Sequence, residues 1–407
     1  MVGVALAALG AAGPVKAASE TAFVGCRIVP SADALSIADG VLVIREGRIA
    51  AVGARGRTKV PAGAERISCN GGTLLPGFWN SHVHFMGPEW RGAERLPATR
   101  LSAQLADMLT RYGFAHVVDT GSDLANTLSI RRRILSGEVR GPGIITAGGA
   151  LVGPTGTPFY VTDGKLAELH DAEQARRLVA QSIRAGAGAV KLMSVSLTRE
   201  QPFPSIPAET IRAVADEAHR AGVKVLVHPT NRRGVELAID GGADVLLHTA
   251  PIGGPWDARF AEHIVGARVA LVPTLKLWGY EAAKTNDTAM AQHFAEVAQQ
   301  QVAAFRKAGG RILFGTDVGY MTDFDPADEY LQMHASGMAA RDILASLTTN
   351  PVRTFGAPAR QGRLAPGYDA DLVLVNGNPE TDVKAFADVR RAYRAGRRID
   401  GGARPPE

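Results

Sequence analysis

The chain has 407 residues, of which 46% are hydrophobic and 21% are charged, a composition typical of globular proteins and not of disordered ones. This length suffices for one large domain and a smaller one. The net charge of +5 is spread along the sequence without a basic patch interleaved with aromatic residues, so we expect no nucleic-acid partner.

Residues 1–18 form an apolar run that ends in Val15-Lys16-Ala17, with small residues at the two positions that signal peptidase reads. This pattern predicts a signal peptide and export, to the periplasm or out of the cell. Because no basic residue precedes the run, a cytoplasmic protein with an apolar tail is the alternative. No other apolar stretch is long enough to predict a membrane-spanning helix.

Residues 20–75 alternate as strands do, with turn residues at Asp39-Gly40 and Glu46-Gly47. Residues 359–405 have the same character. We predict that the two ends pair into one small β-sandwich domain. Cys26 and Cys69 lie in its first part, where they form either a disulfide or two small buried side chains, and two cysteines do not decide between these.

Residues 76–358 repeat a strand followed by a helix, which predicts βαβ units and a (β/α)8 TIM barrel of the α/β class. The eight predicted strands are residues 78–85, 114–121, 143–149, 189–195, 224–229, 244–249, 270–275 and 312–318. Of the connecting helices, one starts after Asp171, one runs from Pro207 to Gly222, and one ends at Gly309-Gly310. The long irregular loop over residues 151–164 is expected on the catalytic face.

Candidate functional residues stand at the downstream ends of these strands. His82 and His84 are two apart, so both side chains point to one side of the first strand and can chelate an ion; two hydrogen-bonded polar residues are the alternative. His228 and His248 end two successive strands, and buried histidines are costly unless they are hydrogen-bonded or ligated. Asp317 ends the eighth strand, where a carboxylate can bind a metal or accept a proton from water.

Lys191 ends the fourth strand. An ammonium group facing two metal ions would be repelled by them, which leaves two interpretations: an ordinary lysine that points away, or a modified one. Carboxylation of the amine would give an anionic ligand able to bridge two cations. The residues alone favour the ordinary lysine.

Several segments together resemble the amidohydrolase superfamily, in its branch of imidazolonepropionase-like and Xaa-Pro dipeptidase-like enzymes. They are TLLPGFWNSHVHF, GAVKLM, VHP and GGADVLLH with their histidines twenty positions apart, FGTDV, and the tail ILASLTTNPVRTFG with GRLAPGYDADLVLVNGNP. The resemblance covers nearly the whole chain. It implies that His82, His84 and Asp317 bind one of two divalent ions, expected to be zinc.

The resemblance further implies that His228 and His248 bind the second ion and that carboxylated Lys191 bridges both. True imidazolonepropionases are similar in sequence but use one metal and lack this lysine. One position departs from the family, since Asn80 replaces the usual Asp ahead of the histidine pair. That change touches the surroundings of the metal and not its ligands.

The implied reaction is hydrolysis of an amide or peptide bond by a hydroxide that the two ions share, with Asp317 taking its proton and passing it to the leaving amine. We expect a dipeptide or N-acyl amino acid as substrate, with its free carboxylate held by Tyr160, Asn231 and Arg232. For the arginine, the exposed start of a helix is an equally good interpretation.

Two other functions fit the same pattern. A hydrolase of cyclic substrates, such as a lactonase or a cyclic amidohydrolase, would use the same ligands. A non-catalytic binding protein is the more remote alternative, because all six ligand positions are filled. Proteins of this kind are frequently dimers or larger, so we expect a homo-oligomer.

Overall fold

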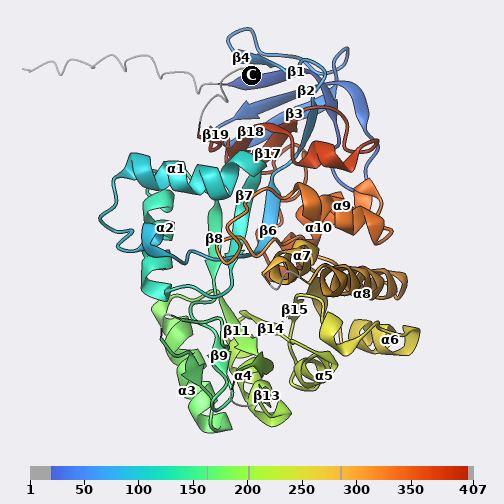
Figure 1. Ribbon diagram of the computed structural model, residues 1–407. Helices are drawn as coiled ribbons and strands as arrows, with labels where there is room; N and C mark the ends of the chain where they lie inside the picture. The colour runs from blue at the N-terminus through green and yellow to red at the C-terminus, as the bar shows by residue number, and fades with distance from the viewer. Residues whose placement is uncertain (1–19, 163, 200–201, 285–286, 402–407) are drawn as a thin grey trace, which may run out of the picture.

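The structure is a computed structural model that describes residues 20–162, 164–199, 202–284 and 287–401. The predicted signal peptide, residues 1–18, lies outside the described residues. Figure 1 shows two units: strands from both ends of the chain gather at one end of the molecule, and the middle of the chain forms strands with helices packed outside them.

Strands from both chain ends hydrogen-bond into a single eight-stranded sheet. They are β1 (Thr21–Ile28), β2 (Ile37–Arg45), β3 (Arg48–Ala54), β4 (Glu65–Ser68), β5 (Thr73–Pro76), β17 (Leu372–Val375), β18 (Val389–Arg394) and β19 (Arg397–Arg398). The order is β19-β18-β17-β5-β1-β2-β3, with β4 beside the first half of β1 and β5 beside its second half. Antiparallel pairing of β5 with β17 joins the two chain ends, as predicted. The hydrogen bonds connect all eight strands into one sheet, in which β1 pairs with both β4 and β5, whereas the sequence predicted a sandwich.

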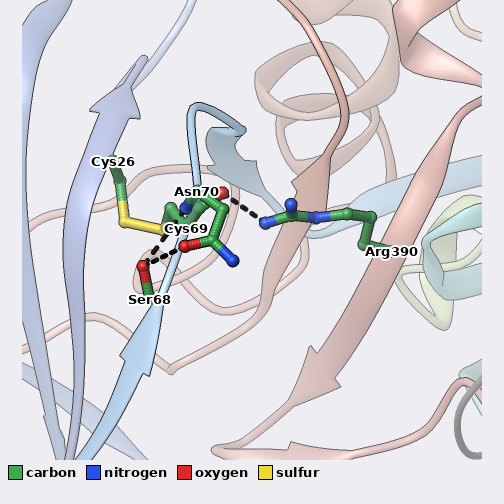
Figure 2. The surroundings of a disulfide bond; sticks show 5 residues. All are labelled: Cys26, Ser68, Cys69, Asn70 and Arg390. Atoms are coloured by element: carbon green, nitrogen blue, oxygen red, sulfur yellow. Dashed lines mark hydrogen bonds between the residues drawn. A yellow bond between two sulfur atoms is a disulfide. The ribbon is translucent and has the colours of Figure 1, made fainter.

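A disulfide joins Cys26 in β1 to Cys69, directly after β4, with 5.0 Å between the Cα atoms (Figure 2). The sequence left this pairing open, and the structure has the disulfide. The guanidinium of Arg390 in β18 donates to the carbonyl oxygen of Cys69, so the cross-link also contacts the C-terminal part of the sheet. Such a bond stabilises a fold mainly by restricting the unfolded chain.

Seven of the eight predicted barrel strands are present: β6 (Phe78–Val83), β7 (Phe114–Asp119), β8 (Gly143–Thr146), β11 (Ala189–Met193), β14 (Lys224–His228), β15 (Val245–Leu247) and β16 (Ala270–Val272). They pair in parallel as two groups, β6-β7-β8 and β11-β14-β15-β16. The N–H of Gly188, just before β11, donates to the carbonyl oxygen of Thr146 at 2.8 Å, which connects the two groups.

The eighth predicted strand, residues 312–318, forms no continuous ladder. It is held by isolated parallel bridges from Ile312 to Leu271 of β16 and from Val318 to Val83 of β6. The N–H of Asp317 also donates to the carbonyl oxygen of His82 at 2.9 Å. This segment therefore closes the ring between β16 and β6, but with an irregular backbone at the position of Asp317.

The helices of the middle unit are α1 (Ala98–Met108), α2 (Leu124–Leu135), α3 (Ala172–Ala185), α4 (Ala208–Arg220), α5 (Arg232–Asp240), α6 (Ala258–Gly266), α7 (Leu275–Ala283), α8 (Thr288–Lys307), α9 (Ala327–Ala335), α10 (Ala340–Leu347) and α11 (Thr349–Phe355). The predicted start of α3 is confirmed, because the Asp171 carboxylate accepts from the N–H of Gln174 at 2.7 Å. The short strands β9 (Leu151–Val152), β10 (Ala167–Glu168), β12 (Val195–Leu197) and β13 (Pro202–Ser205) lie in the connections. Within the described ranges, no helix has the length and apolar character needed to cross a membrane.

A buried polar link joins the barrel to the terminal sheet. Nε2 of His116 in β7 donates to a carboxylate oxygen of Asp371, next to β17, at 2.7 Å, and the imidazole stacks on Trp79 with 4.7 Å between ring centroids. Burial opposes ionisation of Asp371, but His116 outweighs it and holds the pKa of that carboxyl below its ordinary value. His116 is therefore a residue of the core and not a metal ligand of the centre described below.

Candidate metal centre

The structure brings the four predicted histidines together at the carboxyl ends of the barrel strands. His82 and His84 lie at the end of β6, His228 ends β14, and His248 follows β15. The ring centroids are 4.6 Å apart for His82 and His248, 4.6 Å for His228 and His248, and 5.2 Å for His82 and His84. Residues far apart in the sequence thus present imidazole nitrogens to one small volume.

Asp317 completes a convergent group with the first two histidines. Its Oδ1 lies 3.2 Å from Nε2 of His82 and 2.9 Å from Nε2 of His84. Within the described part of the chain, these are the three His, Cys, Asp or Glu side chains whose ligand atoms all lie within 4.8 Å of one another. The donor set is two imidazoles and a carboxylate, which Zn²⁺ accepts readily.

The protonation of His84 shows why a cation fits this group. Its Nδ1 lies 3.3 Å from the carbonyl oxygen of Gly121, which can only accept, so in the neutral ring Nδ1 carries the proton and Nε2 presents its lone pair to Asp317. Nε2 of His82 and Oδ1 of Asp317 are buried and make no hydrogen bond with any described residue. A proton can bridge only one of the two contacts of Oδ1, whereas a metal ion satisfies both.

Thr274 fixes the orientation of the His248 ring through a contact with its Nδ1. Its hydroxyl donates to the carbonyl oxygen of Pro273 at 2.8 Å and lies 2.6 Å from Nδ1 of His248. Because the hydroxyl proton is already used, the hydroxyl oxygen accepts from Nδ1–H, and Nε2 of His248 keeps a free lone pair. Outer contacts of this kind set the tautomer of a metal-binding histidine.

The backbone turns sharply at His248 and Asp317, where the chain leaves the barrel strands. His248 has a φ of 74° and Asp317 a φ of 62°, in the left-handed region that costs a residue with a side chain about 1–3 kcal/mol. Gly319 has a φ of 96°, and a Cβ atom there would lie 1.9 Å from the carbonyl oxygen of His84. Only glycine therefore allows the loop after Asp317 to pack against the end of β6.

Asn80, the residue that departs from the family pattern, is fully buried at the base of the centre. Its amide donates to the hydroxyl of Thr316 at 2.7 Å, and its Oδ1 accepts from the N–H groups of His82 and Thr316, each at 3.2 Å. Asn80 thus ties β6 to the segment that carries Asp317, and its contacts are those of a structural residue.

Burial keeps the histidines in the state that binds metal. It lowers the pKa of His82 to about 4 and that of His228 to about 3, so both rings are neutral near pH 7. Burial works against ionisation of Asp317, yet His82 and His84 hold its pKa well below the ordinary value. The centre therefore presents neutral imidazoles and an anionic carboxylate.

Lys191 on β11 is 4% exposed, and burial lowers the pKa of its amine to about 8. The charges of Asp317 and Asp119 act on it from nearby in the opposite direction. At such a pKa about a tenth of the amines are neutral at pH 7. Lys191 is thus buried within reach of the charge of Asp317, unlike the ordinary lysine pointing away that the residues alone favoured.

Asp119, which was not predicted from the sequence, ends β7 and is fully buried. Its carboxylate accepts from the hydroxyl of Ser122 and, at 2.7 Å, from that of Thr146 on β8. Burial raises its pKa, while hydrogen bonds and His84 oppose the shift. An acidic residue at the end of the otherwise apolar strand FAHVVD was the available signal, the same one that identified Asp317.

Tyr160, a predicted substrate residue, lies beside Tyr320, with 5.7 Å between ring centroids in an edge-on arrangement. Burial raises the pKa of its phenol, and Asp317 and Glu281 add to the shift, so the hydroxyl stays protonated. Tyr320 donates to Glu281 at 2.8 Å, and Lys284 donates to both of them, at 3.1 Å to the phenol and 2.6 Å to the carboxylate. No sequence pattern predicts this polar cluster.

Asn231 and Arg232, the other two predicted substrate residues, have structural contacts at the start of α5. The side chain of Asn231 accepts from the N–H of Gly234 at 2.9 Å and caps the helix. The Arg232 guanidinium stacks 3.8 Å above the ring of Phe260 in α6 and lies 3.6 Å from Asp257. The structure does not bring this arginine together with the histidines.

Comparison with known proteins places this centre in context. The sequence profile of the Amidohydrolase family matches residues 73–399. The ochratoxinase of Aspergillus niger is 25% identical over 376 residues, which cover 81% of this chain and 76% of the relative. An imidazolonepropionase of Kosmotoga olearia is 33% identical over 89 residues, 19% of this chain and 22% of the relative.

A solved structure of a Xaa-Pro dipeptidase with bound methionine superposes with a TM-score of 0.79 at 23% identity, covering 93% of this chain and 99% of that one. At this identity the likeness shows the fold alone, and it supports a barrel of the TIM type. The match of the family profile extends over far more than half of the sequence. The chain therefore belongs to the amidohydrolase family and is a hydrolase that acts on carbon–nitrogen bonds.

Proposed function

We propose that this protein is a metal-dependent hydrolase that cleaves the amide bond of a dipeptide or an N-acyl amino acid. One observation carries the proposal: Oδ1 of Asp317 faces two buried imidazole nitrogens, at 2.9 and 3.2 Å, where a divalent cation satisfies all three. Ions held there would supply Lewis-acid chemistry, which activates water and polarises the carbonyl of the bond to be cleaved.

The ligands divide into two groups in this proposal. His82, His84 and Asp317 hold one zinc ion, and His228 and His248 hold another. The contact of His248 with Thr274 supports the second group, because it leaves Nε2 of His248 free to bind.

Lys191 bridges the two groups once its amine is carboxylated. The neutral amine attacks CO₂, an N–C bond forms, and the nitrogen loses a proton, so that the side chain changes from a cation to an anion. The lowered pKa of Lys191 supports this step, since only the neutral amine reacts. An anion at this position also relieves the repulsion that an ammonium group would meet beside two cations.

Asp317 moves the proton of the reaction. It begins as a carboxylate, accepts a proton from the attacking water, and delivers it to the nitrogen of the leaving amine. The phenol of Tyr160 donates a hydrogen bond to the free carboxylate of the substrate, because it is protonated and makes no hydrogen bond with any described residue. The likeness to a Xaa-Pro dipeptidase supports a short substrate of this kind.

Hydrolysis of matched substrates tests the proposal. We expect turnover of N-acyl amino acids and dipeptides, weaker turnover of the same compounds with the carboxylate converted to an amide, and loss of turnover in Asp317→Asn. Tyr160→Phe should raise KM for the free acids and leave KM for the amidated controls unchanged. Turnover of lactones without any turnover of amides would overturn the proposal in favour of a hydrolase of cyclic substrates.

A further inference from the structure

A cleft of about 760 Å³ lies where the terminal sheet meets the barrel, away from the metal centre. Its walls come from the turn between β2 and β3, the connection from α2 to β8, and the turn between β18 and β19. At this junction β18 contacts β7 of the barrel, and Figure 1 shows the terminal sheet at the end of the barrel strands. The six candidate metal ligands take no part in its lining, so the cleft is a separate site.

Arginines dominate the polar lining of this cleft. They come from three separate segments of the chain: Arg48, Arg140, Arg394, Arg397 and Arg398. The carboxylates in the lining are those of Glu46 and Asp369. Asp369 is already engaged by Arg360, whose Nε donates to it at 3.0 Å. The cleft therefore gathers positive charge that its own carboxylates do not balance.

Three of these arginines have no counter-charge. Arg398 is paired with Asp400 at 2.7 Å, but within the described residues the guanidinium groups of Arg48, Arg140 and Arg397 make no hydrogen bond or ion pair. Like charges gathered without partners repel one another, and low-dielectric walls concentrate their field. A bound anion relieves that repulsion.

Arg394 adds a cation that is built into the wall. It is half-buried, and its Nε donates to the carbonyl oxygen of Gly141 at 3.1 Å, which fixes the guanidinium plane. The buried carboxylate of Asp371 is already occupied by His116 and by the N–H of Ala395, each at 2.7 Å, and no ion pair joins it to Arg394 within the described residues. The terminal nitrogens of Arg394 are thus left as fixed donors, and a guanidinium group matches the paired oxygens of a phosphate or carboxylate.

Apolar side chains form much of the remaining lining. Ile134, Val139 and Ile399 are buried in the wall, and Leu135 is 70% exposed at the rim. An exposed leucine beside a group of arginines suits a ligand with an apolar body and an anionic head. A volume of about 760 Å³ lies in the range of small-molecule sites.

We propose that this cleft binds a soluble phosphate monoester, with the phosphate against the arginines and the organic group against Leu135. A monoester carries close to two negative charges at neutral pH, which suits several unpaired guanidinium groups better than one carboxylate does. Such a ligand bridges the β18–β19 turn and the α2–β8 connection, and so it fastens the sheet to the barrel. The proposal is independent of the reaction at the metal centre.

Calorimetric titration of the full chain with phenyl phosphate, at fixed ionic strength, tests this site. The double variant Arg140→Gln/Arg397→Gln removes two exposed arginines of the cleft, and Arg57→Gln/Arg132→Gln removes two exposed arginines elsewhere as the matched control. We expect at least tenfold weaker binding in the first variant, binding within twofold of wild type in the control, and unchanged amide hydrolysis in both.

A further variant, Leu135→Ser, tests the apolar contact. It should weaken binding of phenyl phosphate and leave that of inorganic phosphate unchanged. Equal weakening in the cleft variant and its control would show unspecific attraction and overturn the proposal. So would binding that survives in the cleft variant but disappears when metal is chelated, or binding to vesicles of anionic lipid without any binding of phenyl phosphate.

Discussion

Replacing Thr274 with valine removes the hydroxyl that orients His248 while keeping the shape of the side chain. Both residues are buried, and the contact between the hydroxyl and Nδ1 is 2.6 Å long. Valine leaves Nδ1–H without a partner, a loss of about 1–3 kcal/mol for a buried donor. Loss of an outer contact typically weakens metal binding by about 10–100-fold, which corresponds to about 1.4–2.8 kcal/mol. The first figure is the expected loss in the free energy of unfolding, and the second is the expected loss in the free energy of metal binding.

Competition with a chelator of known affinity measures this effect, and urea unfolding of the metal-free protein measures the change in stability. Thr348→Val is the matched control, because Thr348, between α10 and α11, is fully buried and its hydroxyl donates to the carbonyl oxygen of Leu344 at 2.5 Å. The control should lose stability but keep its affinity for metal. Unchanged metal affinity in Thr274→Val would refute the reasoning that this hydroxyl sets the tautomer of His248.

Three further predictions concern other parts of the molecule. Glu329 is fully buried and burial raises its pKa to about 8, so the folded protein holds a proton there that the unfolded chain has lost above pH 4.5. The free energy of unfolding therefore falls as the pH rises from 4.5 to 8. Glu329→Gln should remove up to about 5 kcal/mol of this fall, and an identical pH dependence in both proteins, measured by urea unfolding at pH 5 and pH 8, would contradict the prediction. The double variant Cys26→Ser/Cys69→Ser opens a loop with a sequence separation of 43 and should lower the free energy of unfolding by up to about 4 kcal/mol, which a fall in Tm would reveal and an unchanged Tm would exclude. Tyr320 packs edge-on against Tyr160, the proposed substrate-binding phenol, and donates to Glu281 at 2.8 Å. Tyr320→Phe removes that hydrogen bond and should loosen Tyr160, so we expect KM for the amide substrate to rise roughly five- to tenfold, the equivalent of one hydrogen bond, with kcat nearly unchanged. A fall in kcat alone would speak against this positioning role.

Much of the barrel followed from local patterns. Seven predicted strands are present because apolar β-branched runs between helices leave little choice of structure. The histidines and Asp317 were found because the ends of parallel strands meet on one face. The eighth segment was predicted as a strand from its apolar residues, but the positive φ of Asp317 interrupts the ladder, and backbone conformation at a single residue cannot be read from hydrophobicity.

Contacts between residues that are far apart in the chain could not be predicted from the sequence. Thr274 lies 26 residues from the histidine that it orients, and nothing in its surroundings indicates that role. The disulfide depended on how β1 and β4 pair, and two cysteines carry no such information. The arginine cleft is assembled from three segments, each of which looks like an ordinary exposed turn by itself.

Elemental analysis of the metal content, on wild type and on Lys191→Ala, tests the central claim most directly. The two proposed groups of ligands predict about two zinc ions per wild-type chain. Because the carboxylated lysine belongs to both groups, the variant should hold much less metal. One ion per chain, unaffected by the substitution, would contradict the bridged centre and with it the proposed role of Lys191.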